Sequence, residues 1–394
     1  MRLLHRVPLL LLAWTHVGWG LFLRLARPLG RVADDREARP AGPLAGASAD
    51  AVATADRTAA PGPTVSLIIA AYAEQDVIAD TIARLRAQTW PRERLQLIVA
   101  CDGSPDATAE RARAAGADVV LELERGGKHH AQTAGVVAAT GELLLFSDAN
   151  TRWEPDAVAE LAAAFADPAV GYACGRVTFV AAEGGGNQEG AYWRLEMALR
   201  RRESDWWSVT AGNGAIYGLR ADLWPRLRTA HGHDLSLPHQ VVRLGRLAID
   251  RPTAHASEPM VPSIEGEWRR KRRMMNQAWR IVLRGGRRGG LDGGILDPRG
   301  LPPRYLAAIV SHRWLRYASP FLHLLALAAG LRLLASGRAP RADRLLLAAH
   351  LALLAGAAGA GRRRWRPLLL CRYYVAMTAS IAVGLADHLR HGAP

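Results

Sequence analysis

The sequence predicts an α/β domain with a mostly parallel sheet, joined to one apolar helix before it and about three after it. Three observations support this prediction. Short apolar runs alternate with helical patterns between residues 64 and 150, long apolar stretches flank the domain on both sides, and basic residues gather beside those stretches. A chain of 394 residues has room for one large domain or two ordinary ones.

Buried strands and helices are predicted to alternate in the first half of this domain. The four strands are expected over Val65–Ala71, Leu95–Cys101, Asp118–Leu123 and Leu143–Ser147. The three helices are expected over Asp76–Gln88, Asp106–Ala115 and Lys128–Thr140. Such alternation predicts a parallel sheet with right-handed crossovers. No GxGxxG follows the first strand, which argues against a dinucleotide-binding dehydrogenase.

Four apolar stretches are predicted to cross a membrane. Val7–Leu23 has 17 residues without a formal charge, and no small-residue cleavage site follows it. We therefore favour a retained signal-anchor over a cleaved signal peptide. The other three candidates are Tyr317–Ala335, Leu345–Ala360 and Leu368–Leu385, for which buried core helices are the alternative. Ala33–Pro63, rich in Ala, Pro and Gly, is expected to be a flexible linker.

The net charge of +15 is carried almost entirely by arginine, since 49 of the 51 basic residues are Arg. Arg269–Arg288 holds nine basic residues and no acid, and together with Arg362–Arg366 it places residues 64–300 in the cytosol by the positive-inside rule. These basic residues lie beside apolar stretches, which indicates lipid headgroups rather than nucleic acid as partners. Three widely spaced cysteines predict no disulfide framework and a reducing compartment.

Polar residues follow three of the predicted strands, as Tyr72-Ala73-Glu74, Asp102-Gly103-Ser104 and Asp148-Ala149-Asn150. Ligands of parallel sheets bind beyond the carboxyl ends of the strands, so these residues should meet at one edge. Asp148 and Asn150 offer hard oxygen ligands, which predicts Mg²⁺ or Mn²⁺ shared with a diphosphate. A turn or helix N-cap is the alternative for Asp148.

The succession VSLIIAAYAE, LIVACDGSPDAT, GGKHHAQTAG, LLLFSDANTRWEPDAV and AGNGAIYGLR resembles glycosyltransferase family 2. Its membrane-anchored members are the most similar, in the bacterial cellulose synthase-like and polyisoprenoid glycosyltransferase-like group. The similarity runs from about residue 64 to about residue 280. It implies a cytosolic GT-A domain, Rossmann-like with a mostly parallel sheet, on a multi-pass protein of the bacterial inner membrane.

The resemblance also implies the reaction and the organisation of the chain. A sugar, expected from a UDP-sugar donor, would be moved with inversion to a lipid or lipid-linked glycan, with Mg²⁺ or Mn²⁺ and no nucleic acid. The expected parts are a signal-anchor helix over 1–30, a linker over 31–63, the GT-A domain over 64–262, a basic interfacial segment over 263–300 and transmembrane helices over 301–394.

Roles for individual residues follow from the same resemblance. The metal ligands would be Asp148 and Asn150, and Asp234 would be the general base, with an N-cap role as a compatible alternative. The residues that would contact the donor are Glu74, Asp102, Arg125, Lys128, Gly212, Asn213, Gly214, Arg270 and Arg273. Lys128 is one of only two lysines, although a solvated surface position is its alternative. An ordinary turn is the alternative for Gly212–Gly214.

The sequence departs from the family pattern at several positions. Cys101 and His233 each stand where an acid is usual, and Arg270-x-x-Arg273 replaces a Gln-x-x-Arg-Trp signature. The last departure weakens the alternative of a processive polysaccharide synthase. Cys101, Asn150 and His233 leave open a non-catalytic scaffold that binds nucleotide sugar. A metal cluster of His231, His233 and Asp234 is a further, weaker hypothesis, and Glu258 has no assigned role.

A tryptophan-rich segment completes the predictions. The stretch Tyr192–Glu196, with Trp206 and Trp207, is predicted to lie at a membrane surface, because Trp favours that boundary. Core packing is the alternative.

Overall fold

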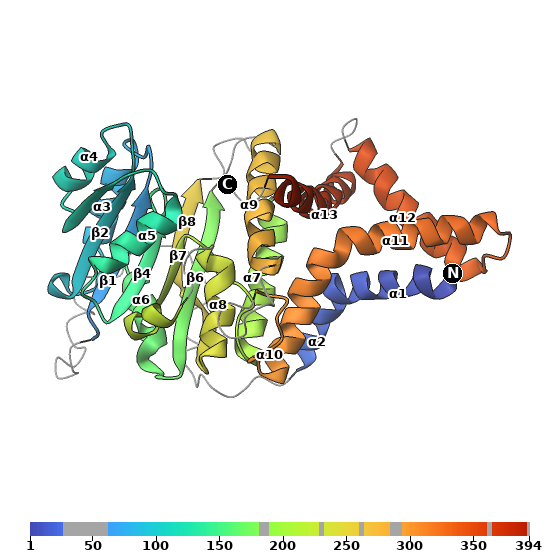
Figure 1. The fold of residues 1–394 in the computed structure, drawn as a ribbon, viewed down its shortest axis with the longest axis horizontal. Helices are drawn as coiled ribbons and strands as arrows, with labels where there is room; N and C mark the ends of the chain where they lie inside the picture. Colours follow the sequence, from blue (N-terminus) through green and yellow to red (C-terminus); the bar gives the residue numbers. More distant parts are fainter. Residues whose placement is uncertain are drawn as a thin grey trace, which may run out of the picture.

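The first half of the sheet follows the predicted pattern (Figure 1). The structure is a computed structural model that describes residues 1–26, 62–180, 189–227, 232–259, 264–283, 294–360 and 365–391, with side chains of 189–193 and 264–267 excluded. The strands are β1 (Val65–Ala71), β2 (Leu95–Asp102), β3 (Val119–Leu123) and β4 (Leu143–Asp148), and the helices between them are α3 (Ile78–Arg86), α4 (Thr108–Ala114) and α5 (Lys128–Val137). β1 pairs in parallel with β2 and with β4, and β2 with β3.

The predicted helices are longer than the observed ones. The backbone N–H groups beyond the observed helix ends make hydrogen bonds that do not belong to a helix. The N–H of Val77 donates to the carbonyl of Glu74, and α3 begins at Ile78, two residues later than the predicted start at Asp76. At the end of α5 the N–H groups of Thr140 and Gly141 donate to Ser66 Oγ, 3.1 and 2.9 Å away, which fixes the chain before β4. The linker predicted over Ala33–Pro63 lies outside the described residues except for its last two positions.

The second half makes the sheet mixed. It adds β5 (Arg152–Trp153), β6 (Val170–Val180), β7 (Ile216–Arg220) and β8 (Leu247–Pro259), with the helices α6 (Ala157–Ala163), α7 (Glu189–Trp206) and α8 (His233–Arg243) and the 3-10 turns η3 (Arg92–Arg94), η4 (Ala164–Ala166) and η5 (Ala221–Arg226). Within the described residues the strand order is β3-β2-β1-β4-β7-β6-β8-β5, and β7 runs antiparallel to both β4 and β6.

Alternation along the strands builds a core on each face of the sheet. On β1, Leu67 and Ile69 pack toward α3, α4 and α6, whereas Ile68 packs on the opposite face. Full burial of each such side chain contributes about 1.5–3 kcal/mol. Helices therefore cover both faces, and only the edges where strands end remain open to ligands.

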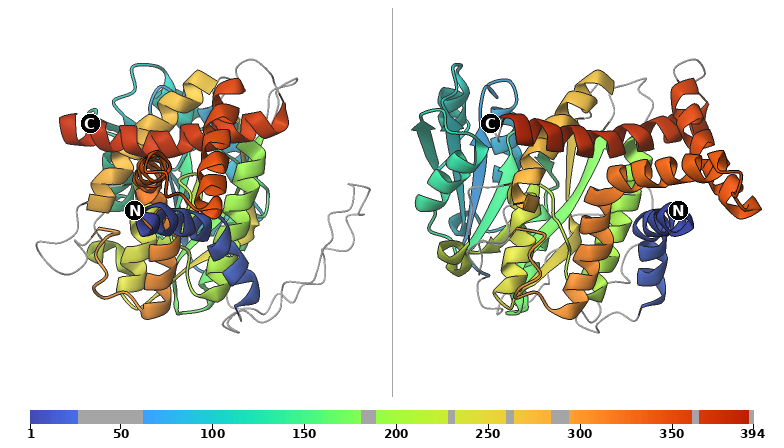
Figure 2. Two further views of the ribbon diagram at one scale, coloured as in Figure 1. Left: turned by 90° about the vertical axis from the view of Figure 1, so that its right-hand side faces the viewer. Right: turned by 45° about the vertical axis from the view of Figure 1, so that its right-hand side comes forward.

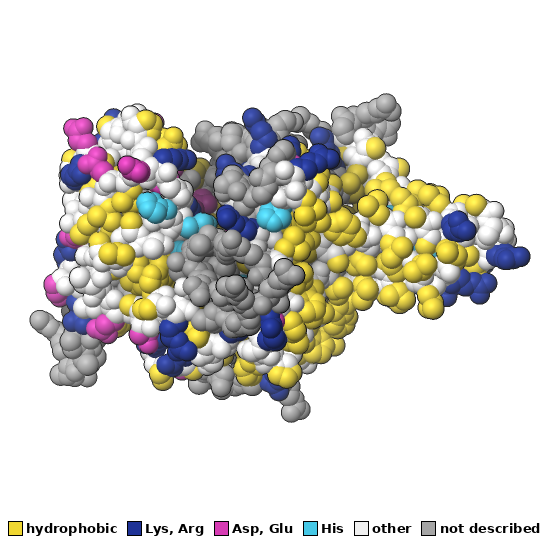
Figure 3. All heavy atoms as spheres, viewed as in Figure 1, with side chains coloured by type: hydrophobic (Ala, Val, Ile, Leu, Met, Phe, Trp, Pro, Cys, Tyr) yellow, Lys and Arg dark blue, Asp and Glu magenta, His cyan; other side chains and the backbone are white. Residues whose placement is uncertain are grey.

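The apolar helices project from the sheet domain (Figure 1). The N-terminal one comprises α1 (Arg2–Ala13), the π-helical η1 (Trp14–Gly18) and α2 (Trp19–Leu25), and the C-terminal ones are α10 (Pro303–Ala308) with the π-helical η6 (Ile309–Trp314) and α11 (Leu315–Ala335), then α12 (Arg341–Gly359) and α13 (Arg366–His391). Among the residues that the structure describes, four segments are long and apolar enough to span a membrane, as predicted. Figure 3 shows hydrophobic side chains covering this part, which suits contact with lipid.

The last helix returns to the sheet domain (Figure 2). α13 packs against α9 (Ile264–Leu283), where the indole N–H of Trp279 donates to the carbonyl of Ile381 at 2.8 Å. Arg272 also binds Asp387 with two nitrogen atoms. The predicted basic interfacial helix is therefore held between the domain and the apolar helices.

Packing rather than exposure explains one of the predicted surface tryptophans. The ring of Trp206 meets Trp19 edge-on at 5.3 Å between centroids and Phe22 at 5.8 Å. α7 is thereby joined to the N-terminal apolar helix, as the core-packing alternative required.

Asp250 on β8 should make stability depend on pH. Burial raises the pKa of its carboxyl from 3.8 to about 6, although Arg200 and Arg201 oppose the shift. Between these values the folded protein binds more protons than the unfolded chain, so the free energy of unfolding falls as pH rises from about 4 to about 6. Asp250→Asn should therefore raise the free energy of unfolding by roughly 1–2 kcal/mol at pH 7.5 and leave it unchanged at pH 4. Urea titrations in detergent at both pH values measure this, and an equal gain at both would contradict it.

Candidate active site

Lys128 and Asp148 meet at the carboxyl edge of the sheet. β4 ends in Asp148, and α5 begins at Lys128 after Gly127 turns the chain with a φ of 89°. The ammonium of Lys128 contacts a carboxylate oxygen of Asp148 and lies 3.5 Å from the carbonyl of Gly214. Burial alone would lower the pKa of Lys128, but Asp148 raises it above its usual value, with smaller contributions from Asp234 and Glu258. Lys128 is therefore paired with Asp148, although 40% of its side chain is exposed.

Further acids surround this ion pair. Glu258, at the end of β8, accepts a hydrogen bond of 2.6 Å from the Thr151 hydroxyl. Burial and then the charge of Asp148 raise the pKa of Glu258, and the same two causes raise the pKa of Glu74. Lys128 and Arg270 offset part of this negative charge, and a bound divalent cation would offset more of it.

The donor set suits a cation that also binds a second partner. Asp148 is one-third exposed, with a side-chain exposure of 33%, and the Asn150 side chain makes no hydrogen bond within the described part of the chain. In that same part no group of three His, Cys, Asp or Glu side chains could hold a metal. A carboxylate and an amide oxygen are hard ligands, so Asp148 and Asn150 fit Mg²⁺ or Mn²⁺, which would take its remaining ligands from a diphosphate and water.

Asp102 fixes the loop that carries Arg125. It is only 3% exposed, and its Oδ1 accepts hydrogen bonds from the N–H groups of Gly126 and Gly127 at 2.7 and 2.9 Å. Gly103 has a φ of 65°, and a Cβ there would lie 2.9 Å from the backbone nitrogen of Arg125. The guanidinium of Arg125 lies over the Tyr72 ring, 3.2 Å from its centroid. Tyr72 and Arg125 thus form a flat, partly exposed platform beside the site.

The Gly212–Gly214 loop lies next to both Lys128 and the start of α8. The N–H of Gly212 donates to the carbonyl of Asp234 at 2.7 Å, and a Cβ at Gly212 would lie 1.9 Å from the Tyr172 hydroxyl. Asn213 is buried and bonds to the backbone of Gly175 and Ile216. Asn213 therefore shapes the loop, and Gly214 presents its carbonyl to the site.

Asp234 lies in the first turn of α8, but Gly232 is the N-cap residue, and the helix has no side-chain cap. The N-cap alternative for Asp234 is therefore wrong. His233 points into the core, where the Tyr217 hydroxyl lies 2.7 Å from its Nδ1. The Gln132 amide donates to the Tyr217 hydroxyl. The hydroxyl proton of Tyr217 is therefore directed to His233. His233 thus anchors α8 instead of ligating a metal, and His231 lies outside the described residues.

The two arginines of α9 that were predicted to contact the donor, Arg270 and Arg273, lie in different surroundings. Arg270 is close enough to Glu258 to affect its charge, whereas Arg273 is exposed. The structure therefore brings Arg270 toward the site and leaves Arg273 on the surface. Sequence reasoning placed Tyr72 at this edge without giving it a role, and it missed Gln132 and Tyr217.

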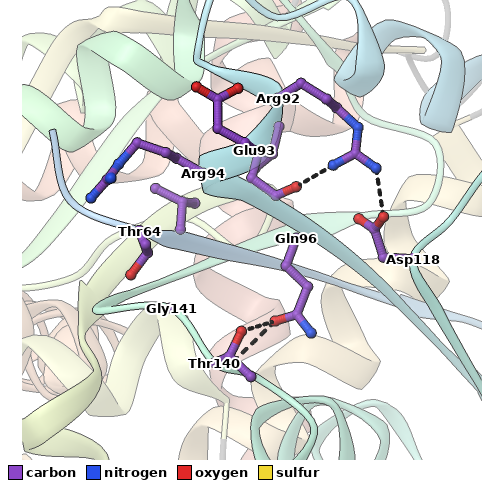
Figure 4. A pocket seen from close by; sticks show the side chains of 10 residues that line it. Thr64, Arg92, Glu93, Arg94, Gln96, Asp118, Thr140 and Gly141 are labelled. Carbon is purple, nitrogen blue, oxygen red and sulfur yellow. Dashed lines mark hydrogen bonds and ion pairs between the residues drawn. The ribbon is translucent and has the colours of Figure 1, made fainter. Parts of the chain in front are cut away.

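A separate pocket lies at the opposite edge, where β1 and β2 begin (Figure 4). It measures about 280 Å³ and is lined by Arg92, Gln96, Asp118 and Thr140 among others. Arg92 binds Asp118 at 2.6 Å, and Gln96 accepts from Thr140. These groups satisfy one another, so this pocket is not our candidate site.

Comparison with known proteins agrees with this geometry. Residues 66–224 match the family described as glycosyl transferase family 2. Two curated relatives are the glycosyltransferase AglE of Haloferax volcanii, 30% identical over 22% of this chain and 31% of its own length, and the putative glycosyltransferase EpsH of Bacillus subtilis, 33% identical over 24% and 28%. The match thus spans about a third or less of each relative's length.

The solved structures include one that extends over nearly the whole chain. It is a mannosyltransferase from Pyrobaculum calidifontis, in complex with GDP-Man and Mn²⁺. Its TM-score is 0.65 at 22% identity, and the match covers 98% of this chain and 99% of that one. At this identity the likeness shows the fold alone, including the apolar helices. Residues 66–224 of this chain therefore form a glycosyltransferase family 2 domain on a GT-A fold.

Proposed function

We propose that the protein transfers a sugar from a nucleotide diphosphate sugar to a lipid or lipid-linked glycan at a membrane, with inversion and a divalent metal. The observation that carries the proposal is the convergence of Asp148, Lys128, Gly214 and Asp234 at one edge of the sheet. The mannosyltransferase of the same fold supports it, because that structure holds GDP-Man and Mn²⁺.

The donor would lie across the strand ends. Tyr72 and Arg125 would stack against the base, and the loop held by Asp102 would face the ribose and phosphates. Lys128 would turn from Asp148 to the diphosphate and offset part of its charge. Asp148 and Asn150 would hold the cation, which stabilises negative charge on the leaving nucleoside diphosphate. Arg270 would bind the same diphosphate from α9, whereas the exposed Arg273 is a weaker candidate.

Asp234 would act as the general base. Its carboxylate takes the proton of the acceptor hydroxyl while the oxygen attacks the anomeric carbon, and the bond from that carbon to the diphosphate breaks. Attack from the face opposite the leaving group inverts the anomeric configuration. The main-chain bond from Gly212 to Asp234 keeps the base next to the donor loop.

The apolar helices suggest where the acceptor comes from. They extend from the same domain as the site, so an acceptor with a lipid tail could lie in the membrane and present its head group. The basic flanks support a cytosolic position of the domain, and the family resemblance supports the bacterial inner membrane as its location.

The experiment is nucleoside diphosphate release by the detergent-purified full chain. Both UDP- and GDP-sugars belong in the panel, with dTDP-sugars, membrane lipids, and Mn²⁺ present or absent. Release from one donor that needs Mn²⁺ and is lost in Asp148→Ala and Asp234→Ala would support the proposal. Binding of a nucleotide without release from any donor would overturn it in favour of a scaffold. Product length separates single transfer from processive synthesis.

The Tyr72 and Arg125 platform gives a prediction about nucleotide affinity. Tyr72→Ala should weaken binding of the preferred nucleoside diphosphate about 5- to 150-fold, because stacking of a base on an aromatic ring is worth about 1–3 kcal/mol. Tyr72→Phe, which keeps the ring, should bind within about threefold of the wild type. Isothermal titration measures both, and equal loss in the two variants would show that the ring does not contact the base.

A further inference from the structure

We propose that Glu203 is a positioning residue, through which the apolar helices from both ends of the chain hold the Gly212–Gly214 loop in its active geometry. The inference rests on the proposed function for its activity measurements, but its structural measurements are independent of that function. It assigns the apolar helices a part in catalysis beyond anchoring.

The Glu203 carboxylate is bound by two helices far away in the sequence and by the loop that follows α7. It lies on α7 with 1% of the residue exposed. Its Oε1 is 2.7 Å from Nδ1 of His312, in the π-helical part of the first C-terminal apolar helix, and accepts from the Trp19 indole at 3.1 Å. Its Oε2 accepts from the N–H and hydroxyl of Thr210 at 3.2 and 2.8 Å. One carboxylate thus joins both membrane segments to the loop.

The charge on this carboxylate is retained despite its burial. Burial alone would raise the pKa of Glu203, but His312 and Arg313 lower it below its usual value. A buried ionised group keeps its partners in fixed places, because losing one leaves an unpaired charge.

The contacts continue from Thr210 toward the site. Arg313 donates to the Thr210 hydroxyl at 2.9 Å, and the buried Tyr305 donates to the carbonyl of Val209 at 3.0 Å. Two residues after Thr210, Gly212 accepts from Arg200 and donates to the Asp234 carbonyl. A displacement of the Thr210 backbone would therefore also displace Gly212, and with it the donor loop and the start of α8 that carries Asp234.

The location of these hydrogen-bond donors indicates a positioning role and not packing alone. Trp19, Tyr305, His312 and Arg313 all belong to the apolar helices, yet their polar atoms bind the domain beside its catalytic loop. The π-helical segment containing His312 and Arg313 departs from regular α-helix where these contacts are made, and such segments are frequent at functional sites.

The test uses Glu203→Gln in the full chain. A glutamine keeps the size but sets an NH₂ donor against either His312 or Thr210, which are themselves donors. We expect kcat to fall about 10- to 100-fold with the donor KM changed less than about threefold, because a misplacement of about 1 Å costs that much. Amide hydrogen exchange in residues 208–214 should become faster. His312→Asn, which keeps a nitrogen donor, should restore most of what His312→Ala loses.

Asp343→Asn is the matched control. Asp343 is equally buried and also binds a histidine and an arginine, His5 and Arg6, but these contacts join α1 to α12 away from the loop. Asp343→Asn should lower the melting temperature, while kcat stays within about twofold of the wild type and amide hydrogen exchange in residues 208–214 is unchanged. Equal effects of the two variants on kcat and exchange, or no change in exchange with Glu203→Gln, would overturn the proposal. If the wild type turns over no donor, the proposed function fails, and the exchange measurements still decide the role of Glu203.

Discussion

Asp148→Asn should lower the rate of nucleoside diphosphate release by about 10²- to 10³-fold. The substitution keeps the shape of the side chain but removes the charge that would bind the cation and that now attracts Lys128. Asn150 cannot compensate, because an amide oxygen is a weaker ligand than a carboxylate. The variant should also bind Mn²⁺ far more weakly in the presence of the nucleoside diphosphate, as measured by electron paramagnetic resonance.

Glu154→Gln is the control for this prediction. Glu154 follows Asp148 in the same segment, but its side chain is half exposed and faces His255. It should release nucleoside diphosphate at the wild-type rate. If Asp148→Asn binds Mn²⁺ and nucleotide as the wild type does, the cation site must be placed elsewhere.

The sheet and the placement of the site could be predicted from local sequence patterns. Runs such as Val65–Ala71 and Leu95–Asp102 are buried on both faces, so they contain almost nothing but apolar residues. Parallel strands then bring their carboxyl ends to one edge, which places Glu74, Asp102 and Asp148 there without knowledge of any contact. Lys128 could be singled out because a lysine is rare in this chain.

The partners of those side chains could not be predicted, because they come from distant parts of the chain. Asp102 binds backbone N–H groups of a loop more than twenty residues later, which no side-chain motif encodes. His233 occupies a position where an acid is usual in the family, yet it contacts Tyr217 in the core. Arg273 belongs to a signature-like spacing on α9, but the rotation of that helix leaves it exposed.

The contacts of Glu203 also could not be predicted from the sequence, because their partners lie far away in the chain. Trp19 is separated from Glu203 by 184 positions in the sequence, and His312 by 109 positions. Both side chains bind the same carboxylate. Sequence patterns mark the two helices only as apolar, because their polar residues are few and do not recur with a period. Tertiary packing alone gives those residues a common partner.

Asp234→Asn should lower kcat by about 10²- to 10⁴-fold while the affinity for the donor nucleotide stays within about threefold. An amide cannot take the proton of the acceptor hydroxyl, so the loss falls on the chemical step. Asparagine is nearly isosteric with aspartate, and Gly232 is the helix N-cap, so α8 should keep its start and the protein its melting temperature. Single-turnover kinetics with a bound donor measure the chemical step directly.

Asp222→Asn, at an exposed position in η5, is the matched control and should turn over at the wild-type rate. The main-chain bond between Gly212 and Asp234 does not involve the carboxylate, so it survives in Asp234→Asn and keeps the donor loop in place. A loss of nucleotide affinity in parallel with kcat would therefore mean that the carboxylate supports the donor site. An unchanged kcat would remove Asp234 as the base. In either case Glu258 is the next carboxylate to test, because it lies close enough to Asp148 and Lys128 for their charges to shift its pKa.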